Sequence, residues 1–172
     1  LYFNALYFPA HTILMISTLI YRPQLFKLAS LLETSIHNPA HKKHFGVIVL
    51  AMFGAIAVVT IGTAAFVEFI GIPLNGFLYG VDFEQYRGLA RIMVATGGLC
   101  AAIDFLYQLI TIMRVQKAVT RAYLISFAVS IPIIWMMVSF TGLNGAVIGS
   151  FSSILILFLL LISEYAVARM KN

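Results

Sequence analysis

Residues 46–70 read GVIVLAMFGAIAVVTIGTAAFVEFI, a stretch in which Glu68 is the one charged residue. A helix that rises about 1.5 Å per residue needs about 20 apolar residues to cross about 30 Å of hydrocarbon. A lipid core offers no water to a bare backbone N–H or C=O, so a spanning segment must be a helix or part of a closed barrel. The stretch is continuously apolar and does not alternate, so it predicts a transmembrane helix.

Four further apolar runs occupy residues 3–20, 89–113, 122–141 and 145–167. Of the 172 residues, 62% are hydrophobic and 10% are charged. The mean hydropathy is +1.00. These patterns predict an all-α membrane protein with five transmembrane helices. The turn residues Thr141-Gly142-Leu143-Asn144-Gly145 predict that the last two helices are antiparallel neighbours.

The basic residues predict the orientation of these helices. Nine of the 11 Lys and Arg residues fall on one side of the predicted spans: Arg22, Lys27, Lys42, Lys43, Arg114, Lys117, Arg121, Arg169 and Lys171. Arg87 and Arg91 fall on the other side. Short loops rich in Lys and Arg stay cytoplasmic, so the C-terminus is predicted to be cytoplasmic. Because the net charge of +5 comes from these loops, we expect no nucleic-acid partner.

Two connecting segments are predicted to be interfacial. Residues 22–44 form an amphipathic cytoplasmic connector, in which Pro23 ends the first span and opens a new helix. Residues 71–87 form an outer loop, in which Pro73 opens a short interfacial helix that Gly80 ends. The chain does not begin with Met and is apolar from Leu1, so we expect it to be part of a longer protein.

No motif for a nucleotide, a metal ion or another cofactor occurs in the sequence, so no enzymatic activity, cofactor, metal site or catalytic residue is predicted. The residue with the clearest chemical interest is Asp104, near the middle of the third span. An isolated ionised carboxylate there is unfavourable by several kcal/mol. Asp104 shares a helix face with small and polar residues: Gly97, Ala101, Gln108 and Thr111. It is either a cavity-lining carboxylate coupled to a cation or proton, or a structural group held by interhelical hydrogen bonds.

His11 lies in the first span, on a face with Asn4, Tyr7 and Thr18. It is either a hydrogen-bonded packing residue or a titrating group that contacts an anionic substrate. The candidate cavity-lining or coupling residues are therefore Asp104, Gln108, Thr111, His11 and Asn4. Glu68 and Glu164 lie near span ends and are interpreted as interfacial residues. Gly145 and Gly149 form a GxxxG spacing that suits close helix packing.

Several short segments resemble bacterial polysaccharide-biosynthesis flippases of the multidrug/oligosaccharidyl-lipid/polysaccharide (MOP) exporter superfamily. They are Phe8-Pro9-Ala10, the segment from Ile20 to Leu25, Gly71-Ile72-Pro73-Leu74, and Leu78-Tyr79-Gly80-Val81-Asp82. The order of spans and loops also fits. The resemblance covers essentially the whole chain, which is similar to the last five spans of a twelve-span member.

The resemblance implies a MATE-like helical bundle and a multi-pass protein of the bacterial cytoplasmic membrane. It also implies cargo: an undecaprenyl-pyrophosphate-linked oligosaccharide, turned from the inner to the outer leaflet. Expected partners are membrane lipids, this lipid-linked oligosaccharide, and a cation or proton as coupling ion. A multidrug exporter or lipid-II flippase of the same superfamily is the first alternative. A membrane-embedded glycosyl- or acyltransferase and a non-transporting membrane scaffold are the others.

Overall fold

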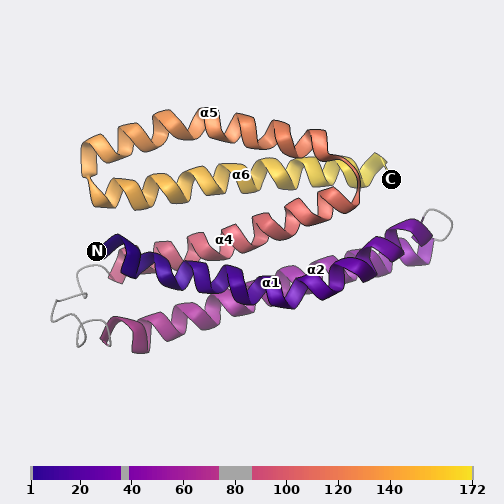
Figure 1. Cartoon of the computed structure of the whole chain (residues 1–172), viewed down its shortest axis with the longest axis horizontal. Coiled ribbons are helices and arrows are strands. Elements are labelled where there is room, and N and C mark those ends of the chain that lie inside the picture. Colours follow the sequence, from indigo (N-terminus) through magenta and orange to yellow (C-terminus); the bar gives the residue numbers. More distant parts are fainter. Residues whose placement is uncertain (1, 36–38, 74–86, 172) are drawn as a thin grey trace.

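The fold is built from helices that lie alongside one another (Figure 1). The computed structural model describes residues 2–35, 39–73 and 87–171, with side chains for residues 8–34, 43–73, 87–142 and 144–170. The elements are α1 (Tyr2–Ser35), α2 (Pro39–Phe66), the π-helical segment η1 (Val67–Gly71), α4 (Arg87–Ile112), α5 (Gln116–Thr141) and α6 (Leu143–Lys171). No strand occurs in these ranges, and the all-α prediction is confirmed.

Four helical segments are long and apolar enough to cross a membrane within the described part of the chain. They are Lys43–Gly71, Arg87–Ile112, Gln116–Thr141 and Asn144–Met170. The predicted span at residues 3–20 lies in α1, which is not among these four. The four segments together indicate a membrane protein.

Helix α4 is the centre of the arrangement. In Figure 1 it lies between the pair α1 and α2 and the hairpin of α5 and α6. In its most apolar window 61% of residues are buried, against 6% for α5. Its fully buried side chains include Phe105, Leu106, Leu109 and Ile110. Helix α4 is therefore the most buried of the four candidate spans, while α5 presents apolar side chains outward.

The predicted helix break at Pro23 is wrong. Helix α1 runs without interruption from Tyr2 to Ser35 and contains both Pro9 and Pro23. An interior proline is unfavourable by about 3 kcal/mol. However, Tyr21 before the proline and Leu28 after it share one face of α1. Tyr21 is 1% exposed and Leu28 is 0% exposed. Proline is tolerated inside membrane helices where neighbouring helices pack against the segment, and these two buried side chains make such contacts. Most of the predicted amphipathic connector, residues 22–35, is therefore the C-terminal part of α1.

The far end of α2 also differs from the prediction. The helix passes at Val67 into the π-helical segment η1, which ends at Gly71. Single π turns inside a helix shift the side chains that follow them and are frequent at functional sites. This segment places Glu68 where it contacts α4, as described below. The interfacial helix was predicted to begin at Pro73 and end at Gly80, and residues 74–80 lie outside the described residues.

The turn between α5 and α6 confirms the predicted antiparallel neighbours. Gly142, the residue between the two helices, has φ +56°. Glycine adopts this left-handed region without steric penalty. Beyond the turn, a Cβ on Gly145 would overlap the backbone carbonyl of Met137 on α5. A Cβ on Gly149 would lie 3.4 Å from Ile134 Cα. The GxxxG spacing therefore lets α6 approach α5 within the hairpin.

The turn between α4 and α5 contains an arginine in the left-handed region. Arg114 has φ +59°. Its N–H donates to Thr111 O at 3.0 Å, and the N–H of Val115 donates to Ile110 O at 3.3 Å. These two bonds form a Schellman motif, whose left-handed position glycine normally occupies. A side chain at this position is strained by about 1 kcal/mol.

We expect Arg114→Gly to raise the free energy of unfolding by about 1 kcal/mol, because glycine removes this strain. Thermal unfolding of the full-length protein in detergent measures the effect. Arg114→Ala is the matched control, because it removes the same charge and keeps a Cβ at φ +59°. Equal stability of the glycine and alanine variants would show that the turn is not strained.

Candidate functional site

The intramembrane carboxylate Asp104 has a hydrogen-bond partner on another helix. The hydroxyl of Tyr21 on α1 donates to Asp104 Oδ2 on α4. The Tyr21 ring lies 5.3 Å from the Phe105 ring, and Phe53 of α2 meets Phe105 edge-on at 5.3 Å. Three helices thus fix the position of the tyrosine. The site links the Asp104 carboxyl of the central helix to the first helix of the chain.

A second hydroxyl extends this contact. Thr18 Oγ1 lies 3.3 Å from the Tyr21 hydroxyl and 2.7 Å from Leu14 O. A hydroxyl has one proton to donate and two lone pairs that accept. The Tyr21 proton is directed to Asp104 and the Thr18 proton to Leu14 O, so Thr18 Oγ1 lies beside the Tyr21 hydroxyl as an alternative acceptor for its proton. Thr18, Tyr21 and Asp104 therefore form a short polar chain from α1 to α4, which we call the Tyr21–Asp104 cluster.

Close helix contact allows this cluster to form. A Cβ built on Gly97 would lie 2.6 Å from Ala10 Cα, so the backbones of α4 and α1 nearly touch there. The next residue, Gly98, faces α2, where a Cβ would lie 2.5 Å from Thr60 Oγ1. Small residues allow such approaches between membrane helices. Two consecutive glycines thus let α4 pack against α1 and α2 at the same level.

Along the rest of the predicted α4 face, burial of the residues decreases toward the C-terminal end of the helix. Gly97 and Ala101 are buried, and Asp104, Gln108 and Thr111 are partly buried. Thr111 Oγ1 donates to the backbone oxygen of Tyr107 at 2.8 Å, so its hydroxyl bonds within its own helix. Of the predicted polar residues on this face, Asp104 is the one with a described side-chain partner on a neighbouring helix.

The candidates on α1 are placed differently. His11 lies on an exposed face of α1, whereas its neighbour Ala10 is buried against α4. His11 and Asp104 therefore do not share one interior surface within the described residues. The side chain of Asn4 lies outside the described residues.

Two ion-paired groups were not predicted from the sequence. At one end, Glu68 in η1 accepts from Arg91 of α4 at 2.9 and 2.6 Å and lies 3.3 Å from Arg87. At the other end, Glu164 of α6 accepts from Arg121 of α5. The sequence did contain a signal for both pairs, because each acid and its arginine partner lie at the same predicted level of the membrane. The two acids, interpreted as interfacial, also tie neighbouring helices together.

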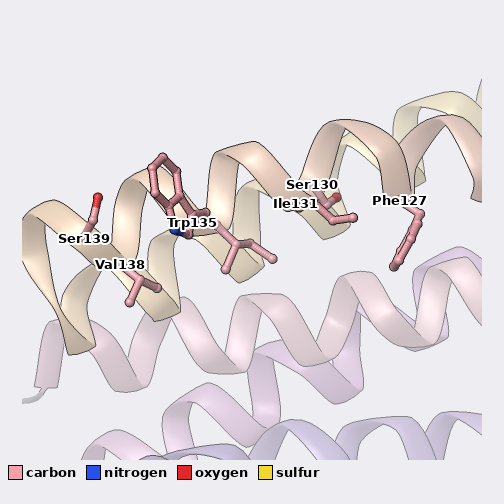
Figure 2. A pocket seen from close by; sticks show the side chains of 7 residues that line it. Phe127, Ser130, Ile131, Trp135, Val138 and Ser139 are labelled. Carbon is pink, nitrogen blue, oxygen red and sulfur yellow. The ribbon is translucent and has the colours of Figure 1, made fainter.

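A groove of about 560 Å³ runs along α5. Figure 2 shows that its labelled side chains project from this one helix. The lining residues recur at helical spacing: Phe127, Ser130, Ile131, Ile134, Trp135, Val138 and Ser139. No charged residue is among them, and the two serines are small. The lining is almost entirely apolar, and the groove is not a cavity that could solvate a sugar headgroup.

Within the described residues, no group of three or more His, Cys, Asp or Glu side chains is placed to hold a metal ion. A scan against protein-family models, a search of curated proteins and a search of solved structures found no match to this chain.

Proposed function

We propose that this chain forms part of a membrane transporter that turns a lipid-linked oligosaccharide from the inner to the outer leaflet. The observation that carries the proposal is Asp104, a carboxylate on the most buried membrane-spanning helix, held by a tyrosine from another helix. Ionisable residues inside membrane spans are unfavourable and usually mark ion or substrate pathways. We assign Asp104 to coupling, with a proton or cation as the coupling ion.

The cargo class is supported by the residue patterns of the outer loop. Residues Gly71-Ile72-Pro73-Leu74 and Leu78-Tyr79-Gly80-Val81-Asp82 resemble those of polysaccharide flippases. On this basis the cargo is an undecaprenyl-pyrophosphate-linked oligosaccharide destined for surface polysaccharide. A sugar headgroup cannot enter hydrocarbon unaided, because each unpaired hydroxyl loses several kcal/mol of hydration. The transporter must replace those hydrogen bonds while the lipid tail stays in the bilayer.

A polar cavity for the headgroup requires more helices than this chain supplies. The groove on α5 is apolar, and α5 is the least covered of the four membrane-spanning helices. We therefore place this chain as the C-terminal part of a two-bundle transporter, with the cavity between the bundles. A glycosyl- or acyltransferase would instead need a reactive acid or histidine near an interface, and Asp104 lies deep in α4.

Deletion of the gene for the full-length protein, followed by lipid analysis, tests this function. Loss of a flippase should leave the fully built lipid-linked oligosaccharide in the cytoplasmic leaflet. Loss of a transferase should give a truncated glycan, and loss of a drug exporter should change only sensitivity to cationic toxins. A truncated glycan, or an unchanged lipid pool, would contradict the proposal.

The same proposal places the C-terminus in the cytoplasm. Lys43 and Asn144 are exposed and lie at opposite ends of the helices. In a Cys100→Ala background we expect a membrane-impermeant maleimide to label Lys43→Cys only in inverted vesicles. Asn144→Cys should be labelled in spheroplasts. Labelling of Lys43→Cys from outside the cell would reverse the topology.

A further inference from the structure

We propose that Tyr21 is the positioning residue that holds Asp104, so that its hydroxyl competes with a proton or cation for Oδ2 of the carboxylate. The coupling role of Asp104 rests on the proposed function. The control of Asp104 by Tyr21 rests on the contacts in the structure, and Tyr21 was not among the residues predicted from the sequence.

The position of Tyr21 supports this role. Its side chain is 1% exposed, although it lies on a helix that the sequence predicted to end there. The ring is held by Phe105, and its hydroxyl reaches Asp104 Oδ2. The Tyr21 hydroxyl is thus buried and donates its one proton to the carboxylate, as expected because buried polar groups in proteins are hydrogen-bonded.

The chemistry of the bond gives it a consequence for access. A hydrogen bond to an ionised group is stronger than one between neutral groups, and more so where water is excluded. While Tyr21 donates to Oδ2, that oxygen is occupied on the side facing α1. A proton or cation that binds at this position displaces the Tyr21 hydroxyl, which can then donate to Thr18 Oγ1 at 3.3 Å. Removing the hydroxyl alone should open the carboxylate without removing the ring.

A hydrophobic carbodiimide measures this access directly, because it reacts with protonated carboxyl groups in membranes. The full-length protein in native membranes is treated with dicyclohexylcarbodiimide, and the modified carboxyls are located by peptide mapping. Glu68 and Glu164 serve as internal references, since both carboxylates are in ion pairs. Tyr21→Phe is the test variant. Tyr107→Phe is the matched control, because Tyr107 is on α4 close to Asp104 and is 40% exposed.

We expect Tyr21→Phe to raise the rate of Asp104 modification about tenfold, as expected for loss of one hydrogen bond to a charged group. Tyr107→Phe and the references should be unchanged. If Tyr21→Phe does not fold, Thr18→Val supplies the second test and should lower the rate by a smaller factor, because the released Tyr21 hydroxyl loses its alternative acceptor. Unchanged modification of Asp104 in folded variants would overturn the inference.

The labelling does not depend on transport, so the two proposals fail separately. Increased labelling of Asp104 in a protein that moves no lipid would leave the control by Tyr21 standing and reject the flippase. Lipid movement with unchanged labelling would reject the control by Tyr21 and leave the flippase standing. In the flippase, Tyr21→Phe combined with Asp104→Asn should slow transport no further than Asp104→Asn alone, because Tyr21 acts through the carboxylate.

Discussion

Gly145→Ala is expected to lower the free energy of unfolding by about 3 kcal/mol, the upper range for overpacking a well-packed contact. The added methyl would overlap the carbonyl of Met137 and lie 2.6 Å from Thr141 Oγ1. A backbone carbonyl cannot move aside as a flexible side chain can. The α5–α6 hairpin must therefore separate or shift to accommodate one methyl group. Thermal and denaturant unfolding of the full-length protein in detergent measure the loss.

Gly62→Ala is the matched control for this experiment. Gly62 is also inside a membrane-spanning helix, and a Cβ there would meet no atom within 4 Å. Alanine is the better helix former, so this variant should be unchanged or more stable by up to about 1 kcal/mol. If Gly145→Ala were as stable as Gly62→Ala, the close contact between α5 and α6 would not exist in the protein.

Asp104→Asn in the full-length protein is expected to slow translocation of the lipid-linked oligosaccharide at least tenfold. Asparagine has nearly the same size and its oxygen can still accept from Tyr21, so the contact between α1 and α4 should persist. The charge and the proton-binding site are lost. A loss of about 1.4 kcal/mol of coupling free energy corresponds to a factor of about ten.

Glu33→Gln is the control, because Glu33 is an exposed carboxylate in the last third of α1. It should translocate normally, at an equal protein level in the membrane. Normal translocation by Asp104→Asn would assign Asp104 to packing. The hydrogen bond from Tyr21 would then be a structural contact between α1 and α4.

The helices were predictable because the bilayer imposes a local rule on the sequence. Each long apolar run must satisfy its own backbone, so length and composition are sufficient to locate α2, α4, α5 and α6. The continuation of α1 through Pro23 was not predictable in the same way. The proline is a local signal for a helix end, and it is overridden by the burial of Tyr21 and Leu28 against other helices. Such packing depends on residues that are distant in the sequence.

The candidate site also contains one feature that a local sequence signal predicts and one that depends on packing between distant residues. Asp104 was found because a single carboxylate in an apolar run is unfavourable wherever the neighbouring helices lie. Its partner Tyr21 is 83 residues away and looks like an ordinary interfacial tyrosine in the sequence. Likewise, the pairing of Glu68 with Arg91 depends on the π-helical segment η1, which no simple periodicity predicts. The sequence identified Asp104 and Glu68 as notable residues, but only the structure shows which residues they contact.

Reconstitution of the full-length protein tests the central proposal most directly. The purified protein is placed in liposomes that contain undecaprenyl-pyrophosphate-linked oligosaccharide with a labelled glycan, and an impermeant glycosidase reports which leaflet holds the label. We expect the protein to move the glycan between leaflets, and Asp104→Asn to do so at least tenfold more slowly at equal protein content. A folded protein that moves no more glycan than protein-free liposomes, with either proton or cation gradients applied, would contradict the proposal.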